Sequence, residues 1–211
     1  MEDRKIGDGM KKKKKAFTLL ELIITLAITV MVLGVIYTFF LSNTKTLTTT
    51  EINTDLQNES QDIQDAIFKY GTEAKGIFSI NGTEVKSDNM LYKDILDSTG
   101  KMEVNEIVFE FDIDKSQSQS KGDKYKFEFD KNNKTLYLTK NNEAKKILST
   151  NIKEFEIRPL DYRMKFDEAS NENKGKVYEA NGIEVSYVLN ITKGYSNVSV
   201  PSSIMVKFRN K

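Results

Sequence analysis

Residues 17–41 form a long apolar run, and this run most limits what the chain can fold into. Apart from a few threonines, its only polar residue is Glu21, and only Ala16 separates the run from five lysines at 11–15. A helix of 25 residues is about 38 Å long, enough to cross the roughly 30 Å hydrocarbon core of a bilayer. The run therefore predicts one transmembrane helix, and the 211-residue chain leaves room for one modest domain beside it.

The residues around the run distinguish it from other apolar segments. A secretory signal has an apolar region of only about 7–15 residues followed by a small-residue cleavage site, whereas this run is longer and ends in a Thr-rich segment. A buried core helix rarely adjoins a block of lysines. By the positive-inside rule, Arg4, Lys5 and the lysines at 11–15 predict a cytoplasmic N-terminus and an external chain after Leu41.

Charge and composition argue against several classes of function. Residues 1–41 carry seven basic and four acidic side chains, and the rest of the chain carries 25 and 27, a balance that does not support nucleic-acid binding. The sequence has no cysteine, no histidine, no Gly-x-Ser-x-Gly and no phosphate-binding glycine loop. Without these groups we expect no disulfide, no Cys–His or Ser–His catalytic pair, no cofactor and no enzymatic activity.

A narrow apolar stripe predicts that the helix continues beyond the membrane. Residues 42–70 contain neither proline nor glycine, and their apolar residues recur at helical spacing: Leu47, Ile52, Leu56, Ile63, Ile67 and Tyr70. We therefore expect one helix from about Phe17 to about Tyr70, ended by Gly71. The stripe on its second half needs a cover.

Alternating apolar residues predict that the cover is an antiparallel sheet. The alternating segments are 105–113, 124–130, 134–140, 151–160, 182–192 and 202–210. Asn81-Gly82 and residues 130–133 predict hairpin turns, 91–98 a short helix, and 114–124 and 167–176 polar loops. The expected fold class is α+β, with a long N-terminal helix, transmembrane in its first half, packed on an antiparallel sheet head domain.

Two groups of side chains in the head have alternative interpretations. Four phenylalanines follow the strand alternation, which favours a core position over an exposed aromatic binding strip: Phe109, Phe111, Phe127 and Phe129. Four acidic residues offer oxygen ligands for calcium, but they lack the Asp-x-Asp-x-Asp-Gly pattern, so a solvated loop without a metal is the simpler interpretation. These residues are Asp161, Asp167, Glu168 and Glu172.

Residues 11–41 resemble the N-terminus of type IV pilins and type II secretion pseudopilins. The shared pattern is a basic leader, a small residue that is usually glycine, then Phe-Thr-Leu-x-Glu and about twenty apolar residues. In "KKAFTLLE", Ala16 takes the small position, Phe17 would begin the mature chain and Glu21 would be its fifth residue. The resemblance implies that a membrane prepilin peptidase cuts between Ala16 and Phe17 and N-methylates Phe17.

The resemblance also gives Glu21 a role. An ionised carboxylate is costly in hydrocarbon. In a fibre of packed helices, Glu21 is expected to pair with the amino group of Phe17 in a neighbouring subunit, which offsets that cost and fixes the axial register. The alternative is that Glu21 only reaches toward the lipid headgroups. The implied division of the chain is a leader at 1–16, a transmembrane and assembly helix at 17–41, its amphipathic continuation at 42–70 and the head domain at 71–211.

The resemblance implies a structural function, that of a minor pilin or pseudopilin acting in fibre initiation or at the tip. Its partners would be prepilin peptidase, other pilin subunits and the membrane, which it spans once before it enters an extracellular fibre. Many repeating pilins have a proline within the apolar helix, and this chain has Thr38 and Gly34 there instead. An uncleaved, membrane-anchored extracellular binding module and a membrane-anchored hydrolase are the alternatives. The sequence leaves the fibre system open.

Overall fold

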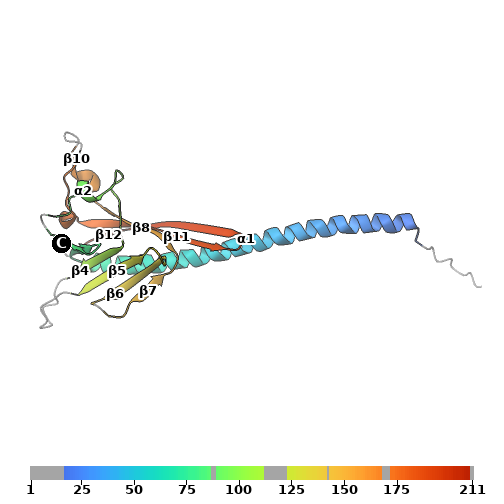
Figure 1. Ribbon diagram of the computed structural model, residues 1–211, viewed down its shortest axis with the longest axis horizontal. Coiled ribbons are helices and arrows are strands. Elements are labelled where there is room, and N and C mark those ends of the chain that lie inside the picture. Colours follow the sequence, from blue (N-terminus) through green and yellow to red (C-terminus); the bar gives the residue numbers. More distant parts are fainter. Residues whose placement is uncertain (1–16, 87–88, 112–122, 142, 168–171, 210–211) are drawn as a thin grey trace, which may run out of the picture. The chain divides into compact units, whose positions relative to one another are not determined.

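The computed structural model describes residues 17–86, 89–111, 123–141, 143–167 and 172–209. It confirms the α+β class, because one long helix, α1 (Leu19–Glu73), is followed by antiparallel strands (Figure 1). The chain divides into two compact units, Met1–Thr46 and Leu47–Lys211, and α1 contributes residues to both. We call the second the head unit.

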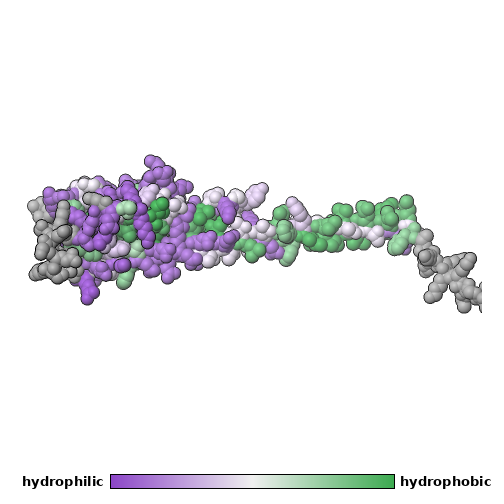
Figure 2. Space-filling view, turned by 90° about the horizontal axis from the view of Figure 1, so that it is seen from below, coloured by the Kyte–Doolittle hydropathy of each residue, from purple (hydrophilic) through white to green (hydrophobic). Residues whose placement is uncertain are grey.

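In the first unit, α1 exposes apolar side chains on all sides. Every residue from 17 to 41 is exposed, and Figure 2 shows a largely hydrophobic surface along this part of the helix. The helix is long and apolar enough to cross a membrane. Threonines inside the apolar run donate their hydroxyls to backbone carbonyls three or four residues earlier, so these polar groups need no partner helix. The pairs are Thr25 with Leu22, Thr29 with Thr25, and Thr38 with Val35.

In the head unit, one face of α1 is buried. The buried positions recur every three or four residues: Ile52, Leu56, Ser60, Ile63, Ile67 and Gly71. The predicted stripe is confirmed except at its ends, since Leu47 is exposed and Tyr70 is half-buried. Ser60 is a polar member that apolar periodicity did not reveal.

The helix ends three residues later than predicted, at Glu73, and Gly71 has a different role from the expected terminator. A Cβ atom built on Gly71 would lie 2.5 Å from Cγ1 of Val206, which is fully buried. Glycine at this position therefore allows the last turns of α1 to approach a strand closely.

One face of the core is a six-stranded antiparallel sheet in the order β2-β1-β4-β5-β6-β7. Its strands are β1 (Gly76–Ile80), β2 (Thr83–Glu84), β4 (Glu106–Glu110), β5 (Lys124–Asp130), β6 (Thr135–Lys140) and β7 (Lys146–Ser149). Both predicted hairpins are confirmed. Asn81 and Gly82 join β1 to β2 with φ angles of 49° and 78°, as a primed turn requires.

The second face is a four-stranded antiparallel sheet in the order β12-β11-β8-β3. Its strands are β3 (Met102–Glu103), β8 (Ile152–Pro159), β11 (Gly182–Lys193) and β12 (Ser196–Lys207). The expectation of a single sheet against the helix is therefore wrong, because the strands of the described residues separate into these two sheets and a small pair. Alternation predicts which face of a strand is buried but not which strand lies beside it.

Both large sheets contribute to one hydrophobic core with α1. The ring of Tyr70 on α1 stacks on that of Tyr125 on β5, with ring centroids 4.1 Å apart. On the other side, the hydroxyl of Tyr187 on β11 donates to the backbone carbonyl of Ser60 at 2.8 Å, and the Ser60 hydroxyl donates to Ser202 on β12 at 2.7 Å. The prediction that the four phenylalanines are core residues is confirmed for Phe109, Phe127 and Phe129, which are buried. Phe111 is half-buried and packs against the core.

A small excursion lies between β8 and β11. It contains the short helix η1 (Tyr162–Lys165), the strand pair β9 (Phe166–Asp167) and β10 (Glu172–Asn173), and η2 (Val177–Glu179). The predicted short helix near residue 92 is confirmed as α2 (Tyr92–Ile95), and the backbone N–H of Tyr92 donates to Gly175 of this excursion at 2.9 Å. The predicted polar loop 167–176 contains β10 and the last residue of β9, so part of it is a short strand pair. Most of the other predicted polar loop, 114–124, lies outside the described residues.

Candidate functional site

The start of α1 is a reciprocal hydrogen-bonded cap built from Thr18 and Glu21. Thr18 precedes the first helical residue, and its hydroxyl accepts a hydrogen bond from the backbone N–H of Glu21 at 3.2 Å. The Glu21 carboxylate reaches back and accepts from the backbone N–H of Thr18 at 2.9 Å and from its hydroxyl at 3.0 Å. This is the capping box that Thr-x-x-Glu sequences form, and it satisfies N–H groups that the first helical turn leaves without partners.

The cap explains how a single chain tolerates a carboxylate in its apolar segment. A lone ionised carboxylate would be costly there, but Glu21 accepts two hydrogen bonds from its own chain. It also lies in the first helical turn, where the helix dipole favours a negative charge. The sequence contains the signal for this cap, because Thr18 and Glu21 have the spacing of a capping box. The sequence-based prediction considered only the position of Glu21 in the apolar run and therefore missed Thr18.

The expected cleavage site lies at the edge of the described chain. Ala16 and the preceding lysines are outside the described residues, whereas Phe17 is described and 77% exposed. Phe17 is thus one residue before the cap and four residues before Glu21. The structure tests neither cleavage nor methylation, and both stay predictions.

The acidic residues that the sequence offers as calcium ligands do not converge in the described part of the chain. Among the residues that the structure describes, no group of three or more acidic side chains is placed to hold a metal ion. Glu168 lies outside the described residues. The described carboxylates are bound to protein donors instead: Asp161 accepts from the hydroxyl of Tyr92 at 2.7 Å, Asp167 pairs with Lys174, and Glu172 pairs with Lys93 at 3.2 Å.

The contact between Tyr92 and Asp161 is an anchor of the excursion. Tyr92 is fully buried, and burial together with the Asp161 carboxylate raises the pKa of its hydroxyl well above the usual range. The hydroxyl therefore stays protonated and donates to Asp161 at any ordinary pH. A Cβ atom on Gly175 would collide with the Tyr92 ring, so the backbone packs directly against it.

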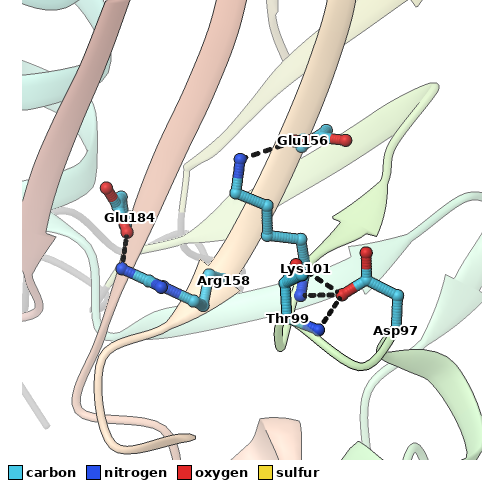
Figure 3. A network of polar contacts seen from close by, with 6 residues as sticks. All are labelled: Asp97, Thr99, Lys101, Glu156, Arg158 and Glu184. Carbon is cyan, nitrogen blue, oxygen red and sulfur yellow. Dashed lines mark hydrogen bonds and ion pairs between the residues drawn. The ribbon is translucent and has the colours of Figure 1, made fainter.

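The outer face of the four-stranded sheet carries paired charges, shown in Figure 3. Arg158 on β8 donates to Glu184 on β11 at 2.5 Å, and Lys101 donates to Glu156 on β8 at 2.9 Å. Each carboxylate in these pairs is matched by a cation, so neither is available as a lone general base. The pair of Lys101 and Glu156, whose side chains are each about a third exposed, contributes little to stability.

A turn beside these pairs is organised by Asp97. One oxygen of its carboxylate accepts from the backbone N–H groups of Thr99 and Lys101 and from the Thr99 hydroxyl (Figure 3). The backbone N–H of Lys101 and the Thr99 hydroxyl hold the pKa of Asp97 below its ordinary value. This geometry is that of a structural turn.

Comparison with known proteins gives one match. Residues 11–37 match the model of the prokaryotic N-terminal methylation motif. No curated protein and no solved structure matches the chain. The matched segment contains the cap of Thr18 and Glu21 and most of the exposed apolar helix.

Proposed function

We propose that this chain, which carries the N-terminal methylation motif that is the hallmark of type IV pilins and pseudopilins, is a minor subunit of a type IV pilus or a type II secretion-like fibre. The motif supports processing by prepilin peptidase and assembly with other pilin-type subunits. It also supports a membrane-anchored precursor that later enters an extracellular fibre. The single observation that carries the proposal is this motif on an apolar helix with all its faces exposed.

We further propose the division of roles along the chain. Residues 1–16 are the leader, cut between Ala16 and Phe17, and Phe17 receives the methyl group. Residues 17–41 hold the protein in the membrane and then in the fibre, 42–70 connect to the head, and 71–211 form the head. In the fibre, the amino group of Phe17 pairs with Glu21 of a neighbouring subunit.

Two features support a minor rather than a repeating role. The mature chain would have 195 residues, the full 211 without the leader, and a bulky head makes tight helical stacking harder. The segments 114–124 and 167–176 are long and polar, and they would crowd lateral neighbours in a repeating lattice. A position at the tip or in the initiating complex leaves one side free.

Mass spectrometry of the membrane and fibre fractions tests the processing. We expect the N-terminal peptide of the mature protein to begin at methylated Phe17. Ala16→Gly should be cut at least as well as the native chain, and Ala16→Asp should keep its leader. A dominant native form that still contains Lys15-Ala16-Phe17 would favour the uncleaved, anchored binding module.

Quantitative proteomics of purified fibres tests the rank. A minor subunit should be far less abundant than the repeating subunit, and its deletion should reduce the number of fibres more than their length. If this chain is the most abundant subunit, the minor role is wrong, although the processing result would stand.

A further inference from the structure

The hairpin of β11 and β12 runs along α1 toward the residues at which this helix enters the head unit (Figure 1). Ser60 of α1 donates its hydroxyl to Ser202 of β12 at 2.7 Å. Nearer the start of the head unit, the hydroxyls of Thr49 and Ser196 lie 2.9 Å apart. The turn that joins the two strands therefore lies at the end of the head unit where the chain arrives from the apolar run.

This turn presents an aromatic and a cationic side chain. Lys193 pairs with Ser196, and between them Gly194 has a φ angle of 58°, as the first central residue of a type II′ turn requires. Tyr195 follows and is 97% exposed, the highest exposure of any large apolar or aromatic side chain in the described part of the chain. Lys193 is exposed as well. At this exposure Tyr195 contributes nothing to the core of the head, so its ring is available to a partner.

The polar side chains behind the turn hold one another. The amide of Asn190 donates to Oδ1 of Asn197 at 2.9 Å and to the carbonyl of Val198 at 3.2 Å. The hydroxyl of Thr192 donates to the same Oδ1 at 3.2 Å. Polar groups that are already hydrogen-bonded cost less to move out of water. The end of the hairpin is therefore cross-linked by its own side chains and suited to a surface poorer in water.

The charges near the turn indicate the kind of surface. The sequence has no acidic residue after Glu184 and none in residues 22–50, although the whole chain has 31. The two segments that meet at Thr49 and Ser196 thus carry no negative charge near their contact. Anionic lipids attract lysine and repel carboxylates, so this end of the head unit suits a lipid surface.

The path along the chain from the apolar run to the turn is short. Residues 22–41 form a helix of about 30 Å, which matches the hydrocarbon core when Glu21 lies at its cytoplasmic boundary. Eight residues of α1, about 12 Å of helix, then lead from Leu41 to Thr49. The headgroup zone outside the core is itself about 5–8 Å thick. This path limits how far the turn can lie from the headgroups, whatever the angle between the two units.

We propose that the turn Lys193–Ser196 is a contact site for the lipid surface in the membrane-anchored precursor. The ring of Tyr195 lies among the headgroups with its hydroxyl toward water, as interfacial tyrosines do. The ammonium of Lys193 contacts the phosphate of an anionic lipid. The inference rests on the membrane anchor of the proposed function and not on the rank of the subunit in a fibre. The contact fixes the head against the bilayer before assembly and is lost when the subunit leaves the membrane.

Tryptophan fluorescence tests the contact, because the sequence has no tryptophan and a single introduced one reports its own surroundings. Tyr195→Trp is made in the full-length chain, in nanodiscs of phosphatidylcholine and phosphatidylglycerol. We expect its emission to shift to shorter wavelength and to lose intensity when the acyl chains are brominated near the glycerol. Emission typical of tryptophan in water, without quenching by the brominated lipid, would overturn the site. A shifted emission without quenching would show that protein rather than lipid covers this residue, which also contradicts the proposal.

Two matched tryptophans separate this contact from the membrane anchor. Tyr37→Trp lies in the apolar run and should be quenched. Tyr178→Trp lies in the excursion, which Figure 1 shows at the other end of the head unit from the turn, and should not be quenched. If Tyr37→Trp alone is quenched, the anchor stands and the contact at Tyr195 is refuted; if Tyr37→Trp is not quenched, both are wrong. Equal quenching of Tyr178→Trp would show a head that lies on lipid without a specific site, against the proposal.

The charge is tested by Lys193→Gln in the Tyr195→Trp chain. A lysine near an anionic surface favours the bound state about fivefold. Replacing phosphatidylglycerol by phosphatidylcholine should therefore lower the ratio of quenched to unquenched tryptophan about fivefold when Lys193 is present, and leave it unchanged in Lys193→Gln. Lys207→Gln, at an exposed lysine at the other end of β12, is the matched control and should respond as the parent chain does. An equal response of Lys193→Gln and the parent would refute the role of Lys193.

Discussion

The close approach of α1 to β12 makes Gly71→Ala a test of the packing between this helix and the four-stranded sheet. Alanine favours a helix over glycine by about 1 kcal/mol. Opposing this gain, the new Cβ would lie 2.5 Å from Cγ1 of Val206 and 3.3 Å from its Cβ. Val206 is fully buried and pairs with Ile183 in the sheet, so it has little room to move.

Overpacking of this kind costs about 1–3 kcal/mol. We therefore expect Gly71→Ala to be destabilising by about 1 kcal/mol after the helical gain is subtracted. For a domain of this size that corresponds to a fall of about 2–4 °C in Tm. The assay is thermal unfolding of the full-length chain in micelles, monitored by near-UV circular dichroism of the tyrosines. This signal reports on the head unit, because the sequence has no tryptophan and eight of its nine tyrosines lie in that unit.

Two further variants make the result decisive. Val206→Ala alone removes two buried carbons, at about 0.8 kcal/mol each before any cavity cost. Combined with Gly71→Ala, it should be less harmful than the sum of the two changes, with a coupling of about 1 kcal/mol. Gly76→Ala is the control, since nothing lies within 4 Å of its Cβ position. A Gly71→Ala protein that is more stable than the native chain, or strict additivity with Val206→Ala, would refute the steric account.

Three other changes test the polar groups. Tyr187→Phe should destabilise the head by about 1–2 kcal/mol, because buried Ser60 loses a donor; Tyr195→Phe, at a residue 97% exposed, should have no effect on Tm. The pKa of Asp97 is lower in the folded than in the unfolded chain, so its contribution to stability is present above its ordinary pKa of 3.8 and is lost as the pH falls through the folded value. The Asp97→Asn protein should therefore lose less of its Tm than the native chain when the pH is lowered through this range. An identical dependence of Tm on pH in the two proteins would exclude Asp97 as a source of the loss. Glu21→Ala should still insert into the membrane but crosslink poorly to other subunits. If the variant and the native chain are recovered equally in sheared fibres, Glu21 has no role in assembly.

Local patterns predicted the elements well because each depends on neighbouring residues. The stripe on α1 followed from helical spacing, and the turn at Asn81-Gly82 followed from two residues that accept positive φ. The pairing of strands depends instead on distant residues. β3 lies beside β8, although 48 residues separate Glu103 from Ile152, and two residues are too few to alternate.

Ser60 shows the same limit within the core. Apolar periodicity skips a serine, yet Ser60 is buried because Tyr187, 127 positions later, satisfies it. The burial of Thr139 on β6 was equally hidden, since a threonine in an alternating strand predicts an exposed position. Only the assembled sheet shows that this hydroxyl is buried without a partner. Sequence patterns thus predict which residues face the core, and the polar exceptions depend on contacts across the fold.

The cap at the start of α1 is compatible with the intersubunit role proposed for Glu21. Both hydrogen bonds from Thr18 end on Oε2 of Glu21, and a carboxylate offers about four acceptor sites. Oε1 is therefore able to accept from the amino group of a neighbour's Phe17 without breaking the cap. In the precursor the cap satisfies the carboxylate within one chain, and in the fibre the same geometry would present a charged oxygen at a fixed height beside the helix start. Because the cap already orients Glu21, little side-chain entropy would remain to be lost when subunits pair.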